Sequence, residues 1–272
     1  MFEFRELNTP NHFSQCHEIQ EKAFALNAEE RISPLILNLL NREWPPIGIV
    51  LGAFSRERGR ENLIGMAFAT ATMEKRSLYG MMVAVLPEYQ NYGVGRQLII
   101  EIRKKAILKN IQRFYGVLEP LEANLAHLYF NRLGYIGEKY EESVFHPSQE
   151  ETRLPFAQDK ILFCWYVQSR RIEILMKNQH LPFQPFLKRP RIPIALPDSR
   201  PDCPKIRIEI PGNFSQLDRS DPEAAKAWRQ RTRNLFREYL NIRHYRITGY
   251  LRPADTPDNK SFYILQKRKH PC

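Results

Sequence analysis

Residues 83-VAVLPEYQNYGVGRQL-98 are the most informative stretch of this 272-residue chain. An apolar run with strand character meets Pro87, and polar and aromatic residues then lead to two glycines and an amphipathic run. A helix that begins after the glycines exposes unpaired amides and a partial positive charge, and glycine lets the backbone approach an anion closely. The stretch therefore predicts a nest for a pyrophosphate, formed by Gln90, Tyr92, Gly93, Val94, Gly95 and Arg96.

The hydrophobic pattern around this stretch predicts a mixed α/β fold. Apolar residues alternate in some segments, as in strands, and recur at helical spacing in others. The expected helices are 11–26, 34–42, about 94–110 and a segment that ends near 133, and the expected strands are 2–7, 47–54, 63–73, 78–86, 113–118, 135–145 and 160–167. This order predicts a mostly antiparallel first half with one helical crossover in the middle of the chain.

The glycine spacing also resembles that of a known family. A dinucleotide-binding fingerprint is excluded because GxGxxG is absent, and no Walker lysine follows the glycines. The pattern V-x-V-x-P-x-Y-Q-x-x-G-V-G instead closely resembles the acetyl-CoA pyrophosphate motif of the GNAT acetyltransferase superfamily. A second stretch, 126-AHLYFNRLGY-135, resembles the later helix-and-strand element of that superfamily. The element order agrees as well, and the resemblance covers about residues 1–170.

Within the superfamily the chain most resembles a little-characterised bacterial subgroup. In that subgroup the strand before the later helix ends in a sequence similar to Glu119-Pro120-Leu121. The resemblance implies a GNAT acyl-CoA N-acyltransferase-like fold for the first part of the chain, with residues 205–272 as an extension of the βαββ type.

The resemblance implies that acetyl-CoA is the cosubstrate and that an amine accepts the acetyl group, without a metal. The backbone at Val83 and Val85 would pair with the pantetheine arm, and the amides from Asn91 to Arg96 would hold the pyrophosphate. The Arg96 side chain adds charge at the nest or is a solvated first-turn arginine, and Asn124 is a cofactor contact or a helix cap. The amine is not identified. Family geometry implies that its pocket is lined by Glu29, Glu30, Arg31 and Trp44 and by strands near Tyr79.

Acetyl transfer needs an acid for the departing thiolate, and in many relatives a tyrosine on the later helix supplies it. Alignment without gaps on Leu133-Gly134 puts Phe130 at that position. Alignment on the Leu-Tyr pair puts Tyr129 there and requires a one-residue insertion. Tyr129 is therefore the candidate acid, and packing of its ring on the sheet is the alternative.

The transfer also needs a base that takes a proton from the amine, and Glu119 is the candidate. It directly follows the strand 113–118, near the place where the central strands of the family separate, whereas the strand 78–86 contains no carboxylate. A capping role in the next helix is the alternative for Glu119, and Glu122 could share it. Glu74 is expected in a turn. His127 could titrate near neutral pH, and an exposed histidine or one satisfied in the core is the more usual alternative.

The last third of the chain carries the whole excess of positive charge. Residues 171–272 contain 21 Lys and Arg against 10 Asp and Glu, whereas residues 1–170 contain 20 of each. Seven prolines between 182 and 204 predict a stiff, extended linker. We therefore expect a GNAT-like domain at 1–170, a Pro-rich linker at 171–204 and a basic unit at 205–272.

The pattern within 205–272 predicts strands at 205–210, 245–251 and 261–267 and a helix at 220–240, which begins with a capping box of Ser220 and Glu223. The helix has one apolar face (Ala225, Trp228, Thr232, Leu235 and Tyr239) and one basic face (Lys226, Arg229, Arg233 and Arg237). The order strand, helix, strand, strand faintly repeats that of 113–167, so this unit could be a partial second GNAT-like lobe.

Two functions remain open. The first is an acetyl-CoA-dependent N-acetyltransferase that acts on an amine of a small molecule or a protein. The second is an acyl-CoA-binding module with little or no catalysis, which docks nucleic acid or an acidic partner through the basic unit. Simple solvation of the basic face is the less specific alternative.

The remaining features concern the environment of the protein. The four cysteines are far apart, so neither a disulfide framework nor a zinc site is predicted. The N-terminus lacks the pattern of a secretory signal, and no apolar run is long enough to span a membrane. We expect a cytoplasmic protein, and assembly as a homodimer is left open.

Overall fold

A computed structural model describes residues 2–57, 59–142, 159–177, 192–256 and 260–268. By its internal contacts the chain divides into two compact units, Met1–Gly116 and Val117–Cys272. The first unit contains β1 (Phe2–Glu6), α1 (Pro10–Phe24), α2 (Pro34–Leu40), β2 (Gly48–Glu57), β3 (Arg60–Ala71), β4 (Ser77–Val85), η1 (Pro87–Tyr89) and α3 (Val94–Leu108), and β5 (Arg113–Leu118) crosses the boundary.

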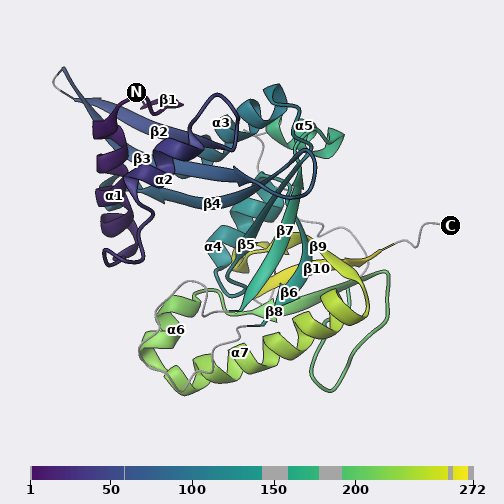
Figure 1. Cartoon of the computed structure of the whole chain (residues 1–272). Helices are drawn as coiled ribbons and strands as arrows, with labels where there is room; N and C mark the ends of the chain where they lie inside the picture. Colours follow the sequence, from purple (N-terminus) through teal and green to yellow (C-terminus); the bar gives the residue numbers. More distant parts are fainter. Residues whose placement is uncertain (1, 58, 143–158, 178–191, 257–259, 269–272) are drawn as a thin grey trace. The chain divides into compact units, whose positions relative to one another are not determined.

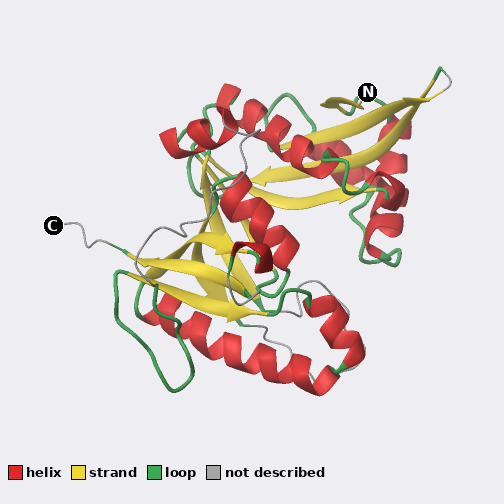
Figure 2. Cartoon of the chain, turned by 180° about the vertical axis from the view of Figure 1, so that it is seen from behind, coloured by secondary structure: helices red, strands yellow, loops and turns green. Residues whose placement is uncertain are grey.

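The second unit begins with α4 (Ala123–Ala126) and the π-helix η2 (His127–Arg132), followed by β6 (Ile136–Glu141), β7 (Lys160–Tyr166) and α5 (Arg170–Lys177). It continues with β8 (Lys205–Ile210), α6 (Phe214–Ser220), α7 (Pro222–Phe236), the π-helix η4 (Arg237–Ile242), β9 (Tyr245–Leu251), η5 (Pro253–Asp255) and β10 (Ser261–Lys267). The mixed α/β class predicted from the sequence is confirmed, and both units contain helices and strands (Figure 2).

Three helices begin with the same local signature, a polar cap followed by a proline. The cap side chains are Thr9 for α1, Ser33 for α2 and Asp221 for α7, and each accepts a backbone N–H from the first turn. The predicted capping box of Ser220 and Glu223 is therefore wrong. Ser220 is the last residue of α6, and the Asp221 carboxylate accepts the Ala224 N–H at 3.0 Å.

The first unit is built on a sheet with the order β1-β2-β3-β4-β5. The pairs from β1 to β4 are antiparallel, and β5 joins β4 in parallel because α3 connects them as a crossover. Helices α1 and α2 cover one face of this sheet, and α3 covers the other (Figures 1 and 2). The core beneath α1 and α2 is apolar, and its buried members include Phe13, Ile19, Leu37, Phe54, Met66 and Phe68.

Strand β4 is irregular in its second half. Met82 pairs with Phe68 and Gly80 pairs with Ala69, so Met81 is an extra residue in a β-bulge. The parallel pairing with β5 covers only Ser77–Tyr79 against Arg113–Tyr115. The rest of β4, from Gly80 to Val85, therefore lies outside the ladder with β5.

The second unit contains a sheet with the order β7-β6-β9-β10-β8, and all of these pairs are antiparallel. Helical segments from both halves of the unit cover the same face. Phe130 of η2 and Phe236 of α7 both meet the ring of Tyr263 edge-on, with centroids 5.7 and 5.4 Å apart. These aromatic contacts form the centre of the core of this unit.

The two halves of the second unit repeat the same order of elements. In each half a strand leads to a helix that ends in a π-helix, η2 or η4, and two antiparallel strands follow. Each π-helix is followed by a residue with positive φ, Gly134 or His244. The strands that follow, β6 and β9, lie side by side with Gly137 opposite Ile247. The faint sequence repeat thus coincides with a repeat of structure.

Part of the predicted Pro-rich linker is bound to the sheet of the second unit. The Ala195 N–H donates to the Arg207 carbonyl and the Arg207 N–H donates to the Pro193 carbonyl, both at 2.9 Å. Ile192 and Ile194 pack on a cluster of Leu251, Phe262 and Ile264. Residues 178–191 of the predicted linker lie outside the described residues, and the predicted domain limits stay predictions. No helix in the described parts of the chain is long and apolar enough to cross a membrane.

Candidate functional site

The predicted nest lies between β4 and α3, and side chains tie its loop to the sheet. The Gln90 Nε2 donates to the Val85 carbonyl at 3.0 Å, so the loop folds back on the end of β4. Asn91 (φ 65°) and Gly93 (φ 81°) adopt the left-handed conformation that the reversal needs. The Gln90 side chain therefore stabilises the loop. The backbone after Gln90 leads into the N-terminus of α3.

The N-terminus of α3 has the features of an anion site. No side chain caps this 15-residue helix, and the first amides of a helix have no partner within the helix itself. A Cβ atom at Gly93 would meet nothing within 4 Å, and one at Gly95 would lie 3.6 Å from Val83 and Val85. Packing within the unit would thus accept a methyl group at residue 95, next to the Val83 and Val85 side chains of β4.

The other predicted binding residues of the first unit fall into two groups. Val83 and Val85 lie on the half of β4 outside the β5 ladder, and the Val85 carbonyl already accepts from Gln90 Nε2. Tyr92 is 72% exposed beside the nest. Val94 is buried at 2% exposure, so its side chain belongs to the core and only its backbone faces the nest. Arg96 lies in the first turn of α3.

In the second unit, Glu119 is a buried carboxylate held by a guanidinium. Its side chain is 11% exposed, and Oε1 accepts from Arg229 Nη1 at 3.0 Å and from the Leu121 N–H at 3.4 Å. Oε2 is buried without a hydrogen-bond partner among the described residues. Burial raises the pKa of Glu119, and the positive charges of Arg229 and Lys160 oppose that rise.

Tyr129 lies in the π-helix η2. The number of residues in this helix is relevant to the choice between the alignment on Leu133-Gly134 and the alignment on the Leu-Tyr pair. A π-helix accommodates one residue more than an α-helix over the same length, and Leu133 N–H donates to Leu128 O at 2.9 Å, five residues back. The alignment on Tyr129, which requires one extra residue before Gly134, is compatible with this helix. Phe130 is 1% exposed and packed in the core.

The Tyr129 ring also takes part in an aromatic cluster. Its centroid lies 4.9 Å from that of Tyr135 and 5.2 Å from that of Phe163. Burial raises the pKa of Tyr129 to about 12. The hydroxyl is therefore protonated at neutral pH, which is the state that an acid requires before it acts.

The other candidates considered for proton transfer are engaged in structural contacts. Glu74 forms an ion pair with Arg113 and accepts from the Tyr115 hydroxyl at 2.6 Å. Burial lowers the pKa of His127 to about 4, so the expectation that it titrates near neutral pH is wrong. Glu122 accepts from the Ser215 hydroxyl at 3.1 Å. Asn124 is exposed on the short helix α4.

Three of the four residues on the predicted basic face of α7 are paired with carboxylates. Arg229 binds Glu119, Arg233 binds both oxygens of Asp159 at 3.0 Å, and Arg237 binds Glu142 at 3.3 Å. These pairs hold α7 against the rest of the second unit. The contact between Arg229 and Glu119 was missed from the sequence because the two residues lie 110 positions apart without a local signal.

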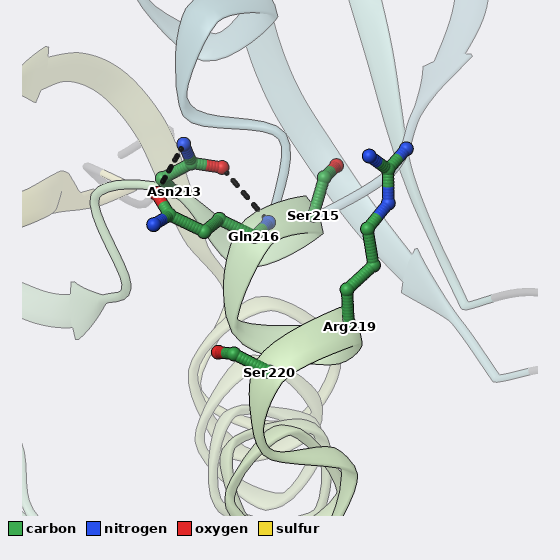
Figure 3. A pocket seen from close by; sticks show the side chains of 5 residues that line it. All are labelled: Asn213, Ser215, Gln216, Arg219 and Ser220. Atoms are coloured by element: carbon green, nitrogen blue, oxygen red, sulfur yellow. Dashed lines mark hydrogen bonds between the residues drawn. The ribbon is translucent and has the colours of Figure 1, made fainter.

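A pocket of about 410 Å³ lies on the second unit around α6 and contains none of the predicted site residues (Figure 3). Its lining residues are Asn213, Ser215, Gln216, Arg219 and Ser220. The Asn213 and Gln216 side chains bind each other at 3.2 Å, and Asn213 Oδ1 also accepts the Gln216 N–H. The polar groups at the start of this short helix are thus satisfied by their own loop.

In the described parts of the chain, His, Cys, Asp and Glu do not gather in groups of three or more that could hold a metal ion. Cys16, Cys164 and Cys203 are not joined in disulfides. Burial raises the pKa of Cys16 to about 12, so this thiol is an inert core residue.

The sequence of the central region matches one protein family. Residues 52–136 match the acetyltransferase (GNAT) domain, and this range includes the nest, Glu119 and Tyr129. The chain carries a GNAT domain. A GNAT-family protein from Desulfovibrio desulfuricans is similar in structure to the region that contains this domain, with 16% identity and a TM-score of 0.50 over 61% of this chain and 99% of that one. The predicted superfamily and fold are therefore confirmed.

Two further solved structures resemble the region that contains the GNAT domain at lower similarity. The ribosomal-protein-S18-alanine N-acetyltransferase of Escherichia coli is 15% identical, with a TM-score of 0.47 over 62% of this chain and 96% of that one. An acetyltransferase of the GNAT family from Streptococcus pneumoniae is 19% identical, with a TM-score of 0.46 over 60% of this chain and 98% of that one. No curated protein sequence matches the chain.

Proposed function

We propose that this protein transfers the acetyl group of acetyl-CoA to an amine. The proposal rests chiefly on one arrangement in the first unit, where the open edge of β4 leads through Gly93 and Gly95 into the uncapped N-terminus of α3. This arrangement offers a row of backbone groups followed by a cluster of amides. Such an order suits an extended arm with its own amides that ends in a pyrophosphate.

The proposed binding roles follow from this order. The backbone of Val83 and Val85 pairs with the pantetheine arm, and the amides from Asn91 to Arg96 bind the pyrophosphate, with Tyr92 at the rim. Gln90 acts indirectly, because its bond to Val85 fixes the loop. Asn124 on α4 is a proposed further contact for the cosubstrate.

Glu119 is the proposed base and Tyr129 the proposed acid. The ammonium group of the acceptor gives one proton to the Glu119 carboxylate, which passes it to solvent. The electron pair of the neutral nitrogen then forms the C–N bond, and the C–S bond breaks with its pair remaining on sulfur. The thiolate takes the Tyr129 proton, and the second proton lost by nitrogen restores Tyr129. The products are an amide, free CoA and one proton.

An acyl-CoA-binding module with little catalysis is the second candidate. Its support is the ion pair between Glu119 and Arg229, because a carboxylate bound to a guanidinium is a weaker proton acceptor than a free one. A nucleic-acid or acidic partner for residues 205–272 has less support, since three of the four arginine and lysine residues on the predicted basic face are already ion-paired.

Release of free thiol from acetyl-CoA across a panel of small amines and peptide N-termini tests the proposal. We expect turnover by the unaltered chain and a loss of kcat of roughly 100-fold or more in Glu119→Gln and Tyr129→Phe. Glu122→Gln is the matched control, because it removes a nearby carboxylate that is bound to Ser215, and it should retain activity. Thermal stabilisation by acetyl-CoA without turnover on any amine would favour the binding module.

A further inference from the structure

The C-terminal extension reaches the proposed base through one side chain. Arg229 belongs to α7, which lies outside the matched residues 52–136, and its Nη1 lies 3.0 Å from Glu119 Oε1. The guanidinium is itself fixed, because its central carbon lies 4.5 Å from the centroid of the Phe214 ring. Arg229 is 29% exposed at its side chain and Glu119 is 11% exposed, so solvent screens this pair only in part.

The two carboxylate oxygens of Glu119 have different surroundings. Oε1 is bound by Arg229 and by the Leu121 N–H, whereas Oε2 is buried and has no hydrogen-bond partner among the described residues. Two contacts to one oxygen fix the rotation of the carboxyl group. The oxygen that could still accept a proton is therefore Oε2.

The charges that face Glu119 come from several elements of the second unit. Arg229 of α7 and Lys160 of β7 are positive and favour the ionised form. Tyr263 of β10 donates its hydroxyl to the Pro120 carbonyl at 2.9 Å, next to Glu119, and the negative charges of Glu119 and Glu122 both contribute to the raised pKa of this tyrosine. Burial also lowers the pKa of Lys160, which makes Arg229 the more dependable positive charge.

We propose that Arg229 is a positioning residue for the acetyl transfer, which holds the Glu119 carboxylate ionised and, by binding Oε1, leaves Oε2 as the oxygen that accepts the proton. This inference rests on the proposed role of Glu119 as the base. Without the guanidinium, a carboxyl group buried to this degree takes a proton at a higher pH and no longer serves as a base near neutrality. The extension thus supplies part of the acid–base machinery that the domain itself lacks.

The test compares Arg229→Gln with Arg229→Lys in the full chain. The matched control is Arg237→Gln, which removes the same charge from η4, directly after α7, at the exposed pair with Glu142. The pH profile of kcat/KM should shift its acidic limb to higher pH in Arg229→Gln, with roughly a tenfold or greater loss at pH 7. In Arg229→Lys the acidic limb should lie between those of Arg229→Gln and the unaltered chain. In Arg237→Gln it should lie at the same pH as in the unaltered chain.

A second readout does not depend on turnover. The ¹³C signal of the Glu119 carboxyl, followed by NMR against pH, should titrate at higher pH in Arg229→Gln than in the unaltered chain. An unchanged signal overturns the proposal. The proposal is also overturned if the ¹³C titration of Glu119 shifts while the acidic limb of kcat/KM does not, since the ionisation of Glu119 then does not control the rate. Absence of turnover in every chain would instead refute the proposed function, and the NMR titration would still decide whether Arg229 sets the charge of Glu119.

Loss of folding in Arg229→Gln does not prevent the test. An unpaired buried carboxylate would be the cause of such a loss, so Glu119→Gln in the same chain should recover the melting temperature. A double variant as unstable as Arg229→Gln alone would show that Arg229 acts only in packing against Phe214, which contradicts the proposal.

Discussion

The side-chain amide of Asn131 forms two hydrogen bonds with the backbone of Tyr250. Its Nδ2 donates to the Tyr250 carbonyl at 2.7 Å, and its Oδ1 accepts the Tyr250 N–H at 3.0 Å. The second half of the unit repeats this contact, because Asn241 binds the carbonyl of Tyr140 at 2.8 Å and its N–H at 3.0 Å. Each asparagine thus lies in the π-helix of one half and binds a strand of the other half.

The two asparagines should differ in their contribution to stability. Asn131 is 3% exposed, so Asn131→Ala leaves two buried backbone groups without partners and should lower the free energy of unfolding by about 2–4 kcal/mol. Asn241 is exposed, and water can replace its bonds, so Asn241→Ala should cost about 1 kcal/mol or less. Chemical denaturation of both variants checks this order, and equal losses would contradict it.

The crossing of β6 and β9 should depend on a glycine. A Cβ atom at Gly137 would lie 2.9 Å from the Ile247 Cβ, which is closer than packing permits. We expect Gly137→Ala to destabilise the chain by about 1–3 kcal/mol. Gly249→Ala in β9 is the control, since its Cβ would meet atoms no closer than 3.6 Å. Similar melting temperatures for both variants would refute this role of Gly137.

Stability should fall in acid because of His127. Its Nδ1 lies 3.1 Å from Asn131 Nδ2, which also binds Tyr250, so the neutral ring accepts a bond that protonation removes. Burial, followed by the charges of Arg252 and Arg132, lowers the pKa of His127 from 6.5 to about 4. The unfolded chain therefore takes up the proton first, and stability is full above about pH 6.5 and decreases towards pH 4.

Substitution of His127 measures this contribution. Because solvent partly screens this half-buried ring, the loss between these pH values should be about 1–2 kcal/mol at most for the unaltered chain. His127→Gln keeps a group that can bind Asn131 and does not titrate in this range, so its stability should vary less with pH there. Denaturation curves at pH 7, 5.5 and 4.5 provide the comparison, and parallel pH dependence in both chains would exclude His127 as the cause.

The start of α7 should depend on Asp221 and not on its neighbour. Asp221→Ala removes the acceptor of the Ala224 N–H and should cost about 1 kcal/mol. Ser220→Ala is the matched control at the end of α6 and should change stability by less than about 0.5 kcal/mol. A larger loss in Ser220→Ala would restore the capping box expected from the sequence.

The features that depend on local periodicity were predicted correctly from the sequence. Alternation located β5, β8 and β9 almost to the residue, and the spacing of Gln90, Gly93 and Gly95 identified the turn into α3. The cap of α7 was misplaced because Ser220 and Asp221 are both good caps. The choice between them depends on the backbone of Asp221, which is extended (φ −150°) and ends α6.

Features that depend on contacts between distant residues could not be predicted. A π-helix differs from an α-helix by one residue and leaves no periodic signal, so η2 and η4 were expected as ordinary helical turns. The basic face of α7 was correctly located, but its carboxylate partners follow from the fold of the second unit. Glu119 was correctly identified as a carboxylate after β5, whereas its pairing with Arg229 became evident only in the structure.

Calorimetric titration of acetyl-CoA into the unaltered chain and into Gly95→Ala is the most direct test of the proposed cosubstrate site. Alanine fits the neighbours of residue 95 and favours a helix by about 0.5–1 kcal/mol, so this variant should be slightly more stable than the unaltered chain. Because a helical Cβ tilts towards the N-terminus of its helix, the added methyl group should narrow the approach to the amides at the start of α3, and binding should weaken by roughly tenfold or more. Gly249→Ala, in the second unit, should bind as the unaltered chain does. Equal affinity in Gly95→Ala, or no binding to the unaltered chain, would contradict an acyl-CoA site at the N-terminus of α3.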